Sequence, residues 1–369
     1  MNGNRAGGTS QRCGNPPAII SQTSQNLNTG APKVLSPPEL LSRLSGRGVR
    51  CDSKDLGAAV LGKMSYQHLL PYVRLLEEGS HQEHSIRELH RLAVFDRKLQ
   101  SVVLEYVGLF ELQLRAQYAD AMGRRFGAFA HTDPHNFKNR GHFDGFMKAY
   151  RTEVSKQLRC GNRSISRSIE AYGEAPIWEA VEIMPFGVLS KLYNNTRPKS
   201  VRHEVSDSFG VASSGLSSWL RSLTVVRNTC AHFSPLVGQR VPYSPARMDG
   251  VSCDNSTPFY AVLVLERLLS SADSIAELPD ACYGIALAQD ITDLFNAFSD
   301  MLPLSGIPND WYDIIVSKPV LGFPVARKVG KPSDGGFWFT LADAESGRLI
   351  KFDRWGGRVI DADVVNDDE

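Results

Sequence analysis

The sequence predicts an all-α protein that ends in a small β-rich segment, and three observations lead to this fold class. The most regular pattern is an uninterrupted amphipathic stretch over 85–122, where apolar side chains recur every three, four or seven positions. Several shorter stretches begin with helix-capping residues and continue with an apolar body. Only the last segment, from residue 336, has the aromatic and β-branched runs that are typical of strands.

The bulk composition is that of a globular protein without a dominant charge. Of 369 residues, 42% are hydrophobic and 22% are charged, and the net charge of +1 means that any anion site must be a local patch. The six cysteines form no CxxC pair, so we expect a reduced, cytoplasmic protein without zinc or another cofactor. No apolar run is long enough to cross a bilayer, so we expect no membrane association.

The first half of the chain predicts a tail followed by three helical segments. Residues 1–32 are rich in Gly, Asn, Gln, Ser and Pro, and predict a disordered tail. Ser36 and Pro37 are suitable residues for starting a short helix. A second helix is expected over 55–77, and the long amphipathic stretch predicts a helix of about 35 residues.

The second half predicts further helices and then strands. Helical patterns resume over 146–159 and from 176, where Pro185 interrupts the helix. Ser213 or Ser214 is a suitable cap for the next helix, and helices are also expected from Thr257-Pro258 and over 285–300. We therefore expect a helical domain over 33–313, a linker over 314–335 and a β-hairpin appendage over 336–369 that turns at Glu345-Ser346-Gly347.

One stretch, TVVRNTCAHFSPL at 224–236, combines a guanidinium, an amide, a thiol and an imidazole at a predicted helix end. An Arg followed by a His after four to six residues is a weak pattern on its own. It occurs at Arg74–His81, Arg124–His131, Arg125–His131, Arg197–His203 and Arg227–His232. Only the last pair lies at the end of a clear amphipathic helix, and it alone has an Asn, Asn228, directly after the Arg.

Helix geometry separates the two ends of this motif. Asn228 and His232 are four positions apart and share a helix face, whereas Arg227 and His232 are five apart and point about 140° away from each other. Arg227 can meet His232 only through its long side chain, through a distorted last turn, or through a second subunit.

Several blocks of the chain, taken in order, resemble the Abi-like (abortive infection) proteins of bacteria, a branch of the HEPN superfamily. The similar blocks are PPELLSRLSGRGV, MSYQHLLPYVRLL, ELHRLAVFDRKLQSVVLEYVGLFELQLRAQYA, WEAVEIMPFGVLSKLY, SWLRSLTVVRNTCAHFSPL and SGIPNDWYD, which together cover about 35–313. The family usually continues its Cys-Ala-His with a second His, and here Phe233 stands in that place. The segment beyond 335 is not part of the resemblance.

The resemblance implies a HEPN-like helical bundle that acts as a metal-independent ribonuclease. RNA brings its own nucleophile, the 2′-OH, so cleavage needs a base, an acid and charge stabilisation at phosphorus. An imidazole such as that of His232 can act as base or acid near neutrality. Arg227 can hold two phosphate oxygens, and Asn228 can donate to a phosphate or fix the imidazole tautomer. Because two imidazoles are needed, the resemblance and the helix geometry both favour a homodimer.

Two further sets of residues have a functional and a structural interpretation. A basic run can contact the RNA backbone or can be a solvated loop; it comprises Lys191, Arg197, Lys199 and Arg202. Glu111 and Arg115 can border the cleft, but an i,i+4 ion pair is the favoured interpretation. Asp96 and Arg97 are expected to make structural contacts, and Cys230 is expected to be a buried packing residue.

Three functions remain open at this stage. The first is an antiphage or toxin-like endoribonuclease that works as a homodimer on RNA. The second is a non-catalytic RNA-binding module held by an antitoxin RNA or protein. In the third, the protein is a helical interaction protein of a toxin–antitoxin or defence system, and the motif at 227–232 is only a helix end.

Overall fold

The computed structural model describes residues 33–79, 83–270 and 283–316 and three strands beyond them. It confirms the predicted all-α fold with a small β appendage. The disordered tail predicted for 1–32 and most of the predicted linker lie outside the described residues. The domain boundaries at 313 and 335 stay predictions.

The N-terminal part packs short helices against the start of the longest one. It contains α1 (Pro37–Ser45), β1 (Val49–Arg50), α2 (Lys54–Lys63), α3 (Tyr66–Gly79) and β2 (His84–Ser85). The single helix predicted over 55–77 is wrong, because Met64 takes an extended conformation and separates α2 from α3. The two-residue strands β1 and β2 pair in parallel, and no pattern in the sequence predicts them.

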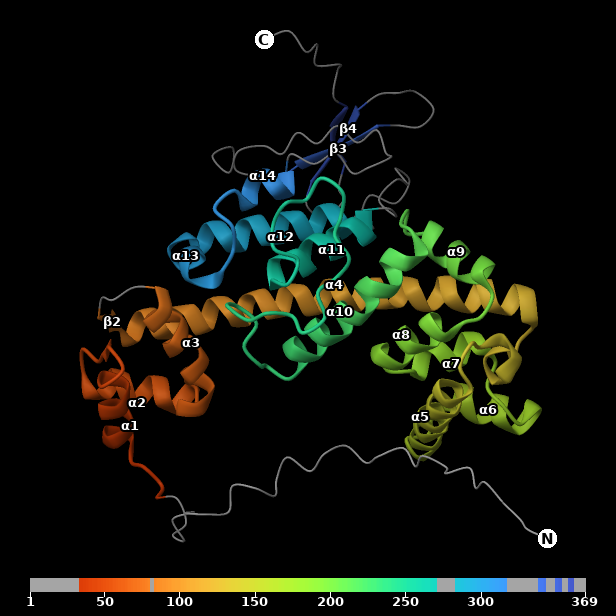
Figure 1. The fold of residues 1–369 in the computed structure, drawn as a ribbon, viewed down its shortest axis with the longest axis horizontal. Coiled ribbons are helices and arrows are strands. Elements are labelled where there is room, and N and C mark those ends of the chain that lie inside the picture. Colours follow the sequence, from red (N-terminus) through yellow and green to blue (C-terminus); the bar gives the residue numbers. More distant parts are fainter. Residues whose placement is uncertain are drawn as a thin grey trace, which may run out of the picture.

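Helix α4 (Ile86–Phe126) is the axis of the molecule (Figure 1). Its 41 residues exceed the predicted length because the helix continues past Met122 to its C-cap at Gly127. A capping box fixes its start: the Ser85 hydroxyl accepts from the Glu88 N–H and the Glu88 carboxylate accepts from the Ser85 N–H. Buried apolar side chains run along nearly its whole length, from Ile86 to Met122, so α4 contributes to every part of the core.

The remaining helices pack around α4. Below its C-terminal half in Figure 1 lie α5 (Arg140–Arg159), α6 (Arg163–Tyr172), α7 (Ile177–Ile183) and α8 (Phe186–Asn195), preceded by the 3-10 turns η1 (Ala130–Thr132) and η2 (Pro134–Asn136). Helix α9 (Lys199–Asp207) leads into α10 (Ser213–Ala231), which crosses α4. On the other side are α11 (Pro258–Ser270), α12 (Tyr283–Ala297), η4 (Ser299–Met301), α13 (Leu302–Ser305) and α14 (Trp311–Val316).

Three details correct the expectations from the sequence. Helices α6 and α9 are not among the helices expected from the sequence, and Lys199 and Arg202, for which a solvated loop was one of two interpretations, lie on α9. The cap of α10 is Ala212, without a side-chain hydrogen bond, so neither Ser213 nor Ser214 is the cap. The predicted hairpin is present as β3 (Trp338–Ala342) and β4 (Leu349–Asp353), and a third antiparallel strand, β5 (Arg358–Asp361), extends it.

Candidate functional site

The Arg227–His232 motif lies at the C-terminal end of α10, where the chain leaves the helix. His232 is the C-cap residue, and its N–H is directed at the carbonyl of Asn228. The Phe233 N–H donates to the Cys230 carbonyl at 3.1 Å and the Ser234 N–H donates to the Thr229 carbonyl at 3.0 Å. These two bonds form a Schellman motif, which fixes the backbone on both sides of His232.

Phe233 occupies the position of this motif that glycine usually takes. Its φ of 53° is the only positive φ found for a non-glycine residue in the described part of the chain. Its ring is 51% exposed, and the guanidinium of Arg97 lies over it, 4.4 Å from the ring centre. Because no glycine stands here, this type of helix end has no signal in the sequence.

A buried carboxylate holds the segment that follows the motif. Asp96, on α4, has no exposed surface. Its oxygens accept hydrogen bonds from the backbone N–H groups of Leu236 (3.0 Å) and Val237 (3.1 Å). The same carboxylate accepts from the Tyr72 hydroxyl at 2.7 Å and from the Gln100 amide at 3.0 Å.

Gln100 adds a second link between α4 and this segment, because its amide also donates to the Ser234 carbonyl at 2.9 Å. Burial raises the pKa of the Asp96 carboxyl, and the four donated hydrogen bonds act in the opposite direction. The structural role predicted for Asp96 and Arg97 is therefore confirmed. Asp96 connects α3 and α4 to the exit of α10, and Arg97 covers Phe233.

The polar side chains of the motif face solvent. Asn228 and His232 are exposed and Arg227 is half-buried. Nη1 of Arg227 donates to Oδ1 of Asn228 at 3.2 Å, which leaves the Asn228 amide group as a donor. Within the described residues, no hydrogen bond or ion pair joins Arg227 to His232, in agreement with the divergence expected from helix geometry.

Cys230 lies between these residues in sequence but points into the core. It is 1% exposed, and burial together with the charge of Asp96 raises the pKa of its thiol to about 12. A thiol that stays protonated is a poor nucleophile, so the predicted packing role is confirmed. Among the described residues, no three His, Cys, Asp or Glu side chains are grouped so that they could hold a metal ion.

The basic run lies at the other end of α10. Helix α8 runs alongside α10, with Nδ2 of Asn194 3.4 Å from the carbonyl of Ser217. Ser217 and His232 are 15 positions apart, which corresponds to about 22 Å along the helix. Lys191 is exposed on α8, Arg197 precedes α9, and Lys199 and Arg202 belong to α9.

Glu111 and Arg115 form the ion pair that the sequence favoured. Arg115 also donates to the carbonyls of Glu182 (2.7 Å) and Met184 (2.9 Å), so it connects α4 to the junction between α7 and α8. Glu111 is 11 positions along α4 from Gln100, or about 16 Å, and so lies away from the exit of α10. The structure does not bring this pair to the motif.

Comparison with known families gives one match. Residues 59–237 match the family described as "Abi-like protein", which supports a resemblance of this region to that family. The matched region includes α4 and ends one residue after Leu236, so it contains the whole motif and the segment bound by Asp96. Neither the curated proteins nor the solved structures gave a match. Within the described residues, no helix is both long and apolar enough to cross a membrane.

Proposed function

From the match of residues 59–237 to the Abi-like family, we propose that this protein is a defence endoribonuclease of the HEPN type. The single observation that carries the proposal is the exit of α10. There, a half-buried guanidinium and an exposed amide and imidazole stand on a backbone that is fixed by a Schellman motif and by a buried carboxylate. A helix end that only satisfied its own carbonyls would not need the additional hydrogen bonds to the Asp96 carboxylate.

The proposed reaction uses the 2′-OH of RNA as the nucleophile. One His232 takes the proton of the 2′-OH while its oxygen attacks phosphorus, and the bond from phosphorus to the 5′-oxygen breaks. The partner's His232 gives a proton to the leaving 5′-oxygen. Arg227 and the free amide group of Asn228 stabilise the charge that develops on the phosphoryl oxygens. The products are a 2′,3′-cyclic phosphate and a 5′-OH.

A homodimer supplies the second imidazole. Each chain has one His232, and Arg227 is bonded to Asn228 rather than to His232. Two copies of the exit of α10, facing each other across a twofold axis, would combine two imidazoles with two guanidinium groups. The RNA backbone is the substrate, and an antitoxin RNA or protein that covers this face would keep the enzyme inactive.

The test is RNA cleavage by the purified full chain in the presence of EDTA. We expect cyclic-phosphate ends, and we expect His232→Ala and Arg227→Ala to lose cleavage while their circular dichroism and oligomeric state stay those of the wild type. A wild-type dimer that cuts no RNA under these conditions would contradict the enzymatic proposal.

A second candidate is a non-catalytic RNA-binding module, which Phe233 favours because the resembled family usually has a second His there. In this case Arg227→Ala weakens RNA binding, and no cleavage is found with any RNA. The same set of proteins therefore distinguishes the two functions.

A further inference from the structure

A group of cationic side chains lies where the segment after η2 crosses the segment between α8 and α9. The crossing is rigid: the Lys138 N–H donates to the Asn195 carbonyl and the Arg197 N–H donates to the Asn136 carbonyl, both at 2.8 Å. The side chain of Asn195 also accepts from the Asn139 N–H at 2.9 Å and donates to the Asn139 carbonyl at 3.0 Å. Side chains that leave this crossing therefore start from fixed backbone positions.

Three cations gather here. Nζ of Lys138 donates to the Asn194 carbonyl at 2.9 Å, and the guanidinium of Arg197 donates to the Phe137 carbonyl through Nε and Nη2. Arg202 is on the first turn of α9, where its carbonyl accepts from the Tyr193 hydroxyl at 2.9 Å, next to the Asn194 that Lys138 binds, and its charge acts on Lys138. Burial and this repulsion lower the pKa of Lys138. Lys138 was not part of the basic run read from the sequence, because it lies 53 positions before Lys191.

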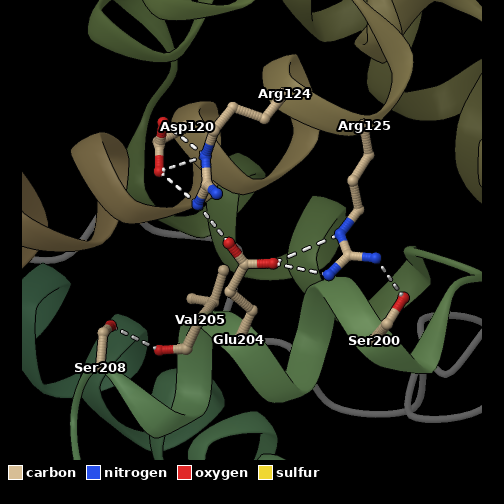
Figure 2. Close-up of polar contacts among 7 residues, drawn as sticks. All are labelled: Asp120, Arg124, Arg125, Ser200, Glu204, Val205 and Ser208. Carbon is tan, nitrogen blue, oxygen red and sulfur yellow. Dashed lines mark hydrogen bonds and ion pairs between the residues drawn. The ribbon is translucent and has the colours of Figure 1, made fainter.

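The neighbouring carboxylates do not neutralise this group. Glu204, two residues after Arg202, accepts from both Arg124 and Arg125 on α4 (Figure 2). Ser200, on the same face of α9, bonds to Arg125 as well, so this face is turned toward α4. In the part of the chain that the structure describes, none of the three cations forms an ion pair with a carboxylate.

The cations also have donors left over. A lysine ammonium has three donors, and one of them is used by the Asn194 carbonyl. Nε of Arg202 is closed off from solvent and has no hydrogen-bond partner in the structure. Like charges held close together are unfavourable in the free protein, and an anion bound by the remaining ammonium donors of Lys138 removes this cost.

We propose that Lys138, Arg197 and Arg202 form a site for a phosphate group of the RNA backbone, which we name the crossing site. The proposal rests on the proposed function for its ligand, since the chemistry alone fits any phosphate. A guanidinium binds phosphate oxygens in pairs, and an ammonium adds a point charge. The crossing site and His232 lie at opposite ends of α10, so a single strand that occupies both runs along this helix.

The experiment measures binding without cleavage, in a His232→Ala background. A short fluorescein-labelled single-stranded RNA is titrated by anisotropy at several salt concentrations. The test variant is Lys138→Gln with Arg202→Gln. The matched control is Arg43→Gln with Lys54→Gln, which removes the same charge from two exposed residues of α1 and α2 that form no ion pair in the structure. Thermal unfolding checks that both variants fold.

The expected result is an affinity about tenfold lower for the test variant than for the control. The slope of the logarithm of the binding constant against the logarithm of the salt concentration becomes shallower by about 0.7 for each lost phosphate contact. Lys138→Arg with Arg202→Lys, which keeps both charges, retains most of the binding. If the test variant binds RNA as tightly as the control does, the crossing site is wrong and the ribonuclease proposal is unaffected.

A second arm covers the case in which the parent binds no RNA, which would contradict the proposed function itself. Inorganic phosphate is then added at constant ionic strength and the melting temperature is recorded. A rise that the parent and the control show and the test variant lacks supports a site for free phosphate. Equal melting temperatures in all three proteins would overturn the crossing site independently of RNA.

Discussion

The carboxylate of Asp96 accepts the backbone N–H of Leu236 at 3.0 Å, across 140 positions of the chain. This hydrogen bond connects the long helix to the segment that leaves the proposed catalytic motif. Because His232 lies only four positions before Leu236, the place of the imidazole depends on a residue of another helix. A carboxylate with no exposed surface is thus a positioning residue for the site.

Loss of the Asp96 carboxylate is expected to destabilise the fold strongly. Asp96→Ala leaves the N–H groups of Leu236 and Val237 buried without acceptors, which lowers the free energy of unfolding by about 3 kcal/mol. Tyr72→Phe is the matched control, since it removes one donor and costs about 1 kcal/mol. Urea unfolding measures both. Equal losses for the two variants would show that the backbone bonds contribute little.

The proposed homodimer predicts that an inactive subunit inhibits an active one. When an excess of His232→Ala protein is mixed with wild type and subunits exchange, mixed dimers have one imidazole, whereas the proposed reaction needs both an acid and a base. We expect RNA cleavage to fall with the fraction of wild-type dimers rather than with the fraction of wild-type subunits. Activity that follows the number of wild-type subunits would mean that each chain carries a complete site.

Cys230 is expected to be chemically inert. With the pKa of its thiol raised to about 12 by burial, almost no thiolate is present at neutral pH. Iodoacetamide should label the exposed Cys160 of the folded protein and spare Cys230, as mass spectrometry can determine. Cys230→Ala should keep full RNA cleavage and lose only about 1 kcal/mol of stability. Loss of cleavage in this variant, with its fold intact, would give the thiol a catalytic role.

His131 makes stability depend on pH. It has no exposed surface, its ring nitrogens have no hydrogen-bond partner among the described residues, and its ring packs edge-on against Tyr150. Burial lowers its pKa from 6.5 to about 4. Between these values the unfolded chain binds a proton that the folded chain does not, so the free energy of unfolding falls as the pH falls.

The expected loss from this group is about 3 kcal/mol between pH 6.5 and pH 4. Urea unfolding over this range measures it, and His131→Leu serves as the comparison because leucine takes no proton. The variant should show a flatter dependence on pH than the wild type. Parallel curves for the two proteins would mean that His131 is not the group responsible.

Arg115 is expected to contribute to the stability of the fold and not to RNA cleavage. Arg115→Ala removes the donors to the Glu182 and Met184 carbonyls and leaves Glu111 unpaired, at a cost of about 2 to 3 kcal/mol. The double variant with Glu111→Ala should be no less stable than Arg115→Ala, because the unpaired carboxylate is then gone. At temperatures where Arg115→Ala is folded, its kcat for RNA cleavage should equal that of the wild type. A lower kcat would show that the Glu111–Arg115 pair contributes to the site.

Those parts of the fold that could be predicted depend on local patterns. The start of α4 shows as a Ser with a Glu three positions later, and its length shows as an apolar period. The separation of α2 from α3 was missed although a local signal exists: Ser65 follows Met64, and its hydroxyl accepts from the His68 N–H as a helix-capping serine does. Helix α9 was missed because Val201 and Val205 alone make its narrow apolar face; both are buried, and ion pairs of Glu204 with Arg124 and Arg125 also join the helix to α4.

The candidate site was predictable to the same extent. The residue types are read directly from the sequence, and the divergence of Arg227 from His232 follows from a helix of 3.6 residues per turn. The support by Asp96 does not follow, since it joins residues 140 positions apart through backbone N–H groups that every residue has. Lys138 likewise joins Arg202 only through the crossing of two distant segments.

The left-handed backbone at Phe233 bears on how this position can change in evolution. Such a φ costs an aromatic side chain about 1 kcal/mol, and the contact with Arg97 returns about 0.5 to 1 kcal/mol. The two effects nearly cancel, and histidine and asparagine tolerate this conformation better than most residues do. A second histidine can therefore replace Phe233, or be replaced by it, in a single substitution that leaves the path of the chain intact. The motif with Phe at position 233 and the motif with His there then differ by one substitution, and both sequences fold.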